Sequence, residues 1–184
     1  MRVISGNFGS RNLKSVPGNK TRPTTDKVKE SLFNMIGPYF NGGNFLDLFA
    51  GSGAVSIEAV SRGFDKATLV DKQYAAIKTI NENISITKQT ESFDVLKMNA
   101  ENALQFLSNQ NKKFDIIFLD PPYKNQKMVE QLQEIYKLNL LNDSGIVICE
   151  TDDNVNLNDD VDHYHLSQQK KYGITIISIY KLQG

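Results

Sequence analysis

The feature that most constrains the fold is the regular alternation of short apolar runs with longer segments of helical spacing. Runs such as "ATLV", "IIFL" and "IVIC" are separated by segments in which apolar residues recur every three or four positions. Short continuous apolar runs are typical of strands that are covered on both faces. Strands that alternate with helices form right-handed βαβ units. The sequence therefore predicts an α/β fold with a mostly parallel sheet.

The individual elements follow from periodicity and from turn residues. Strands are expected at 45–48, 66–71, 92–99, 113–120 and 144–151, followed by a terminal pair at 162–173 and 174–182. Helices are expected at 21–36, 51–63, 72–88, 100–110 and 126–141. Either Thr25 or Asp26 can cap the first helix. We expect a seven-stranded sheet with an antiparallel C-terminal strand.

The chain divides into a short basic arm and one larger domain. Residues 1–22 alternate loosely around glycines, contain no acid and predict a small hairpin. The basic residues of this arm are Arg2, Arg11, Lys14, Lys20 and Arg22. Residues 23–184 contain the alternating pattern, and their length suits one domain.

Composition limits the classes of protein to consider. The formal net charge is zero, so the total does not indicate a strongly basic nucleic-acid binder. Residues 150–162 contain acids and no base, and we interpret them as a solvated loop. The single cysteine, Cys149, excludes an internal disulfide and suits a reducing cytoplasm. The sequence contains no run of about 18 apolar residues, so it predicts no membrane-spanning helix. We expect a monomeric cytoplasmic protein.

No metal site is expected from the sequence. His163 and His165 alternate near the end of the chain, but no cysteine or third ligand stands near them. We interpret both as surface histidines.

A glycine turn follows the first expected strand. In "LDLFAGSGA", Asp47 stands at the strand end and is followed by Gly51 and Gly53. Glycines let the backbone turn sharply and let a ligand lie against it, and the next helix presents free N–H groups. A dinucleotide fingerprint would need a third glycine where Ser56 stands. Asp47 suits a ligand that carries positive charge or amine donors.

Asp71 ends the next expected strand, about 20 residues after the glycines. A carboxylate at this place accepts hydrogen bonds from both ribose hydroxyls of an adenosine. The alternative is that Asp71 caps the following helix, and the two roles are compatible. Together, Asp47 and Asp71 favour a nucleoside cofactor with an ammonium group, which S-adenosylmethionine matches better than NAD.

The fourth expected strand ends in "DPPY", residues 120–123. Two prolines remove two backbone donors and fix an extended chain, so the carbonyls here are free to point into a pocket. Asp120 adds an acceptor, and Tyr123 adds a ring on which a nucleobase can stack. Acceptors beside an aromatic face suit an exocyclic amino group of a base. The alternative is a proline-rich loop with a capping aspartate.

These segments resemble a known family. "DPPY" with "LDLFAGSGAVSIEA" resembles the amino-group methyltransferases that use S-adenosylmethionine. Adding "MRVISGNFGSRNLKS" and "TRPTTDKVKESLFNMI" makes the chain similar to the bacterial RsmD family, from residue 1 to about residue 150 and weakly to the end. The resemblance implies a Rossmann-like class I methyltransferase fold. It also implies transfer of a methyl group to the N2 amino group of one guanine in 16S ribosomal RNA, within a small-subunit particle.

The resemblance also implies roles for individual residues. Those that match the cofactor site are Thr24, Thr25, Asp47, Phe49, Ala50, Gly51, Gly53, Asp71, Lys72, Asn99 and Ala100. Those that match the catalytic loop are Asp120, Pro121, Pro122 and Tyr123. Asn99 stands where the family often has aspartate, at the adenine edge. Lys72 can line the ribose pocket or face solvent. The basic residues of the arm are expected to contact RNA phosphates.

Two other functions remain open from the sequence. One is methylation of another amino group, such as adenine N6 in DNA or RNA or a protein glutamine. Such DNA enzymes usually carry an added recognition domain, and glutamine enzymes usually have asparagine in place of Asp120. The other is a nucleic-acid-binding module without catalysis. The intact "DPPY" sequence and glycine turn argue against that module.

Overall fold

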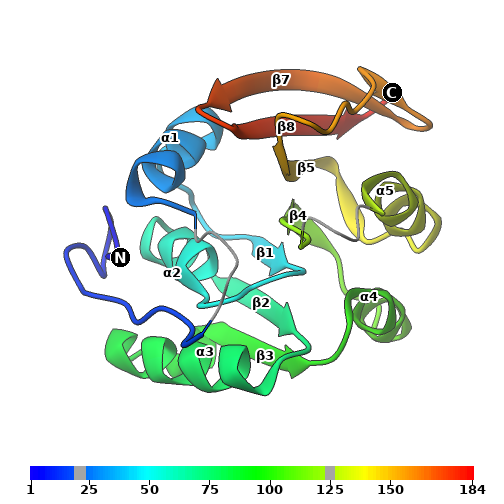
Figure 1. The fold of residues 1–184 in the computed structure, drawn as a ribbon. Helices are drawn as coiled ribbons and strands as arrows, with labels where there is room; N and C mark the ends of the chain where they lie inside the picture. The colour runs from blue at the N-terminus through cyan, green and yellow to red at the C-terminus, as the bar shows by residue number, and fades with distance from the viewer. Residues whose placement is uncertain (19–23, 123–126) are drawn as a thin grey trace.

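The structure is a computed structural model that describes residues 1–18, 24–122 and 127–184 (Figure 1). Its sheet has the strand order β3-β2-β1-β4-β5-β8-β7-β6. The parallel strands are β1 (Asn44–Asp47), β2 (Lys66–Asp71), β3 (Phe93–Lys97), β4 (Phe114–Leu119) and β5 (Leu141–Asp152). The antiparallel strands are β6 (Asp160–Val161), β7 (Tyr164–Tyr172) and β8 (Thr175–Leu182). The expected α/β class with a mostly parallel sheet is confirmed.

The described strands number eight, whereas seven were expected. The additional strand is the two-residue β6, which pairs with the start of β7 at the edge of the sheet. Such a short element has no periodicity that a sequence could display.

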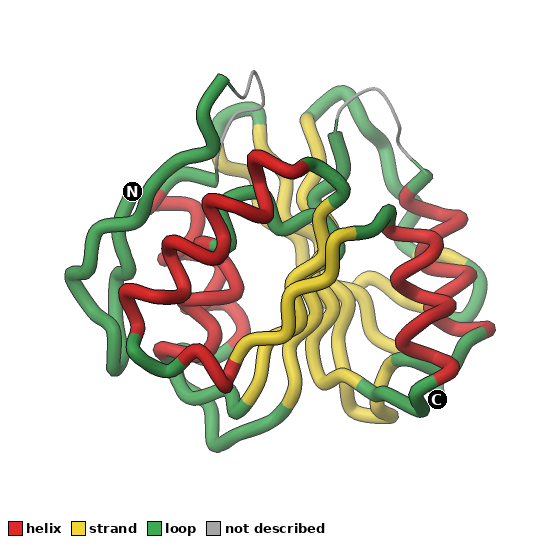
Figure 2. Tube along the Cα trace, turned by 90° about the horizontal axis from the view of Figure 1, so that it is seen from below, coloured by secondary structure: helices red, strands yellow, loops and turns green. Residues whose placement is uncertain are grey.

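Helices cover both faces of the sheet, as Figure 2 shows. One face is covered by α1 (Asp26–Ile36), α2 (Ala54–Ser61) and α3 (Tyr74–Thr87), and the other by α4 (Ala100–Asn109) and α5 (Met128–Lys137). A 3-10 turn at Thr90–Ser92 precedes β3. Each face buries its own cluster of apolar side chains. None of the described helices has the length and apolarity that crossing a membrane requires.

The structure identifies the cap of the first helix and moves the boundary between α5 and β5. Thr25 is the N-cap of α1, since its side chain accepts a hydrogen bond from the Val28 N–H. Helix α5 ends at Lys137 instead of running to residue 141. Asn139 has a positive φ of 53°, which ends the helix, and Leu141 already pairs with Phe114 of β4. β5 therefore begins earlier than expected.

The N-terminal arm packs onto the helices of the first face. Val3, Phe8 and Leu13 are buried in that core, and an antiparallel bridge joins Arg2 to Asn12, as expected for a small hairpin. The arm therefore contributes apolar surface to the domain on which it lies.

A buried carboxylate fixes this arm on α2. Glu58 is fully buried and accepts hydrogen bonds from the backbone N–H groups of Ile4 at 2.9 Å and Ser5 at 3.2 Å. Two buried cations neutralise it, with Arg62 Nε at 2.9 Å and Lys29 Nζ at 3.7 Å. Burial lowers the pKa of Lys29 even though Glu58 and Asp26 oppose this shift. A charge buried in this way is tolerated because its partners satisfy it.

Candidate active site

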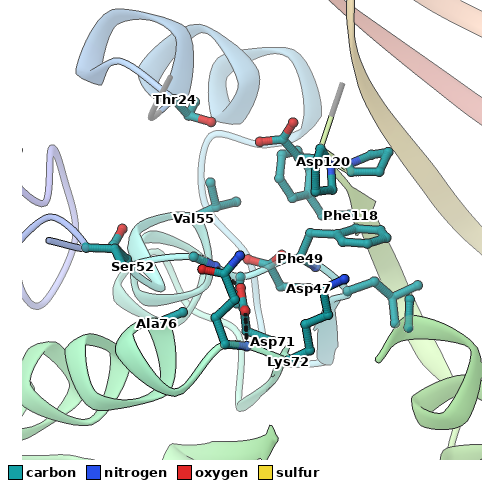
Figure 3. A pocket seen from close by; sticks show the side chains of 18 of the residues that line it. Thr24, Asp47, Phe49, Ser52, Val55, Asp71, Lys72, Ala76, Phe118 and Asp120 are labelled. Atoms are coloured by element: carbon teal, nitrogen blue, oxygen red, sulfur yellow. Dashed lines mark hydrogen bonds between the residues drawn. The ribbon is translucent and has the colours of Figure 1, made fainter. Parts of the chain in front are cut away.

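A pocket of about 280 Å³ lies at the carboxyl ends of the central parallel strands. Figure 3 shows Asp47, Asp71 and Asp120 on its wall, which follows from the end positions of β1, β2 and β4. Of the residues assigned from the sequence, those that line this pocket are Thr24, Asp47, Phe49, Ala50, Gly51, Asp71, Lys72, Asn99, Ala100, Asp120, Pro121 and Pro122. The carboxyl ends of parallel strands are the usual ligand site in such sheets.

Asp47 is a buried carboxyl at the floor of the pocket. Its Oδ2 accepts a hydrogen bond from Ser56 Oγ at 3.0 Å, and its Oδ1 accepts one from the Phe49 N–H at 3.4 Å. Burial raises the pKa of Asp47 to about 7, although these two hydrogen bonds oppose the shift. Ser56, which replaces the third glycine of a dinucleotide fingerprint, thus has a defined task.

The glycine turn presents open backbone to the pocket. Gly51 has a positive φ of 56°, and a Cβ added there would meet no atom of the described residues within 4 Å, so a ligand can lie against it. Its N–H donates to Asp71 Oδ2 at 3.0 Å. Gly53 has a φ of 82°, is the N-cap residue of α2 and is not among the described lining residues of the pocket. A Cβ at Gly53 would come within 3.0 Å of Leu69, so this glycine serves packing.

Asp71 joins the glycine turn to the start of α3. Besides accepting from Gly51, it accepts a hydrogen bond through Oδ1 from the N–H of Gln73, the N-cap residue of α3, at 2.9 Å. Each carboxylate oxygen can accept a further hydrogen bond. Asp71 is not the N-cap of α3, which is Gln73, so the capping role suggested by the sequence is wrong. Its position remains compatible with a ribose ligand.

Asp120 follows β4 in a strongly acidic part of the pocket. Its pKa is raised well above the usual range, first by burial and then by the charges of Glu150, Asp47 and Asp152. Glu150 accepts a hydrogen bond from Thr24 Oγ1 at 3.1 Å. Glu150 and Asp152 belong to the end of β5, and their charges act on Asp120. The expectation of a solvated loop is therefore wrong for these two acids. A carboxyl with a raised pKa can accept a proton near neutral pH.

The remaining residues assigned from the sequence have mixed positions. Asn99 is the N-cap of α4, because its side chain accepts a hydrogen bond from the Asn102 N–H at 2.8 Å. Thr25 caps α1 and is absent from the pocket wall as described. Tyr123 lies outside the described residues.

Two basic residues of the arm bind to α3 of the same chain. Arg11 donates to the carbonyls of Ile86 and Thr87, in the last turn of α3, at 3.2 and 3.0 Å. Lys14 forms an ion pair with Glu82 at 2.9 Å. Arg2 is exposed, whereas Lys20 and Arg22 lie outside the described residues. The arm also places Met1, Ser15 and Val16 on the pocket wall, which the sequence did not reveal.

Asn83 connects the arm to the glycine turn. Its Nδ2 donates to the carbonyls of Lys14 at 3.0 Å and Ser52 at 2.9 Å, and its Oδ1 accepts from the Lys14 N–H at 2.8 Å. It is fully buried in α3, and the sequence contains no signal for this role. The structure thus fixes the turn from two sides, through Asp71 and through Asn83.

The whole chain resembles known proteins. A family model described as "Conserved hypothetical protein 95" matches residues 1–181. YlbH of Bacillus subtilis (strain 168) is 47% identical over 184 residues, which are 100% of this chain and 100% of that protein. "Ribosomal RNA small subunit methyltransferase D" of Haemophilus influenzae is 30% identical over 182 residues, covering 98% of this chain and 93% of that protein.

A solved structure agrees with this likeness. The Escherichia coli protein yhhF has a TM-score of 0.83 at 30% identity, covering 100% of this chain and 98% of that chain. The match therefore includes the basic arm as well as the sheet.

Proposed function

The chain belongs to the RsmD family, and from this we propose that it transfers a methyl group from S-adenosylmethionine to the N2 amino group of a guanine in 16S ribosomal RNA. The expected class I methyltransferase fold is confirmed by the likeness to the solved structure of yhhF. One observation supports the activity above all: Asp120 and Pro121 share a pocket with the open glycine turn at Gly51 and with Asp71.

The described residues fit the cofactor. Asp47 and the turn at Gly51 offer negative charge and open backbone to the methionine part, and Asp71 offers carboxylate oxygens to the ribose. Ala100, with Asn99, forms the wall on the side where the adenine would lie. When bound, S-adenosylmethionine supplies an electrophilic methyl group on a sulfonium.

Asp120 has two tasks in this proposal. Its carboxylate accepts a hydrogen bond from the substrate amino group, which holds the nitrogen lone pair toward the methyl group. Because an amino group on a base needs no strong base before attack, its proton can leave after transfer. Burial, together with the neighbouring charges of Glu150 and Asp47, raises the pKa of Asp120, which favours taking up that proton. Catalysis thus consists of positioning and local electrostatics.

The RNA is proposed to approach over the arm. Arg2, and Lys20 and Arg22 outside the described residues, would contact phosphates, which gives affinity that falls with salt. The guanine must leave its stack to enter the pocket, at a cost of a few kcal/mol. A looped segment in a small-subunit particle lowers that cost.

The proposal is tested with labelled S-adenosylmethionine and ribosomal particles from cells that lack the protein. We expect one guanine of 16S ribosomal RNA to be labelled at N2. Asp120→Ala should abolish nearly all transfer and leave cofactor affinity within about twofold. The exposed Asp143→Asn, at the far end of β5, is the matched control and should leave transfer unchanged. Label on an adenine, cofactor binding without transfer, or Asp120→Ala turnover within twofold of wild type would each contradict the proposal.

A further inference from the structure

Gln131 carries a buried polar atom that no described residue satisfies. The side chain is 6% exposed, and its Oε1 has no hydrogen-bond partner among the described residues. Gln131 also lines the pocket, in the first turn of α5, where its backbone N–H donates to Lys127. A buried amide oxygen without a partner is costly, and such groups usually have one. Because Gln131 borders the pocket, a rotation of its side chain would bring the amide oxygen to a ligand there.

Gln131 lies on the side of the pocket that α4 and α5 form. Helices α4 and α5 cover the same face of the sheet. Residues at or just before the starts of these helices line the pocket, namely Met98, Ala100 and Lys127. Thr24 and α1 belong to the opposite face. Asp71, the proposed ribose ligand, is the last residue of β2. The neighbouring strand is β3, and the turn after β3 leads into α4. A base attached to that ribose would lie on the α4 and α5 side.

The side chain expected at the adenine edge is already engaged. Asn99 Oδ1 accepts the Asn102 N–H that begins α4, so this oxygen is shared with a helix cap. The amide of Gln131 has an acceptor oxygen with no such commitment among the described residues. We propose that Gln131 recognises the adenine of S-adenosylmethionine, its amide oxygen accepting a hydrogen bond from the exocyclic N6 amino group.

The chemistry of the amide suits this base. A primary amide presents one acceptor and two donors side by side, and adenine presents its amino donor beside a ring-nitrogen acceptor. The two groups can therefore pair through two hydrogen bonds. This inference rests on the proposed cofactor, and it adds a residue that determines which base the pocket accepts.

The test is a binding titration that removes each partner in turn. Calorimetry compares S-adenosylhomocysteine with its analogue in which purine replaces adenine and the exocyclic amine is missing. Wild type should bind the analogue about tenfold more weakly, the order of one good side-chain contact to a base edge. Gln131→Leu should bind S-adenosylhomocysteine about tenfold more weakly than wild type and should bind both ligands equally.

The controls separate recognition from packing. Gln133→Leu is the same substitution on the same helix, where the side chain donates to Asp162, and it should keep the wild-type preference for adenine. Gln131→Leu should unfold at the same or a higher temperature, because it removes an unsatisfied acceptor. If it misfolds, Gln131→Met keeps the chain length and supports the same comparison.

The outcomes are distinct. Equal loss of both ligands in Gln131→Leu, or unchanged binding of both, would overturn the role of Gln131 while leaving the cofactor proposal intact. Failure of wild type to bind S-adenosylhomocysteine would overturn the proposed function and this inference together.

Discussion

Replacing Asp47 by asparagine should stabilise the ligand-free protein, and more so at high pH than at low pH. Asp47 is 1% exposed, and burial raises its pKa from 3.8 to about 7. In the unfolded chain the carboxyl ionises near its ordinary pKa. Between these two values the folded protein holds a proton that the unfolded chain releases, so wild-type stability falls as pH rises. The asparagine variant lacks this fall.

The size of the effect follows from the shift. A rise from 3.8 to about 7 corresponds to about 4 kcal/mol over the whole window, and about 2 kcal/mol of it falls between pH 5 and pH 7. Asparagine keeps the shape of the side chain and can still bond to Ser56 and to the Phe49 N–H. The stability gain of Asp47→Asn at pH 8 should therefore exceed its gain at pH 5 by about 2–3 kcal/mol.

Urea unfolding followed by circular dichroism at pH 5, 6, 7 and 8 measures this difference. Asp94→Asn is the control, since its side chain is 45% exposed and paired with the exposed Lys66, and it should change stability by less than about 1 kcal/mol at every pH. An Asp47→Asn effect that is the same at pH 5 and pH 8 would refute the reasoning. The same variant should bind S-adenosylhomocysteine more weakly, because the ligand's ammonium loses its carboxylate.

Two further predictions concern the arm. Glu58→Ala should cost about 3–5 kcal/mol in urea unfolding, because it removes the carboxylate that neutralises the buried Arg62 and Lys29 and that accepts from two backbone N–H groups; a loss below about 1 kcal/mol would show that the network contributes little. Arg2→Glu should weaken binding to ribosomal RNA and lower the slope of log affinity against log salt by about one, whereas Lys112→Glu, exposed after α4, should leave the slope unchanged. Equal slopes for both variants would contradict a phosphate contact at Arg2.

The sheet could be predicted because its signals are local. The apolar runs "ATLV" and "IIFL" became β2 and β4, and the acids that follow the strands line one pocket because parallel strands end at the same edge. The end of α5 was misplaced because Leu140 and Leu141 continue an apolar pattern, while the turn depends on the backbone of Asn139. Periodicity reports which residues are buried and not where the chain changes direction.

Parts of the site were hidden because they depend on contacts between distant segments. Asn83 and Gln131 look like ordinary helix residues, and only the packing of α3 and α5 beside the pocket gives them a role. Glu58 did carry a signal, since it is the single charge within the apolar helix "AVSIEAV". A charge at such a position calls for buried partners, which Lys29 and Arg62 provide.

The hydrogen bonds of Asn83 have a thermodynamic consequence. Because one amide bonds to both Lys14 and Ser52, a shift of the glycine turn changes the hydrogen bonds that hold the arm. Linkage is reciprocal, so the RNA proposed for the arm and the donor proposed for the turn would change each other's affinity by the same factor. The order in which the two substrates arrive would then leave their mutual effect on affinity unchanged.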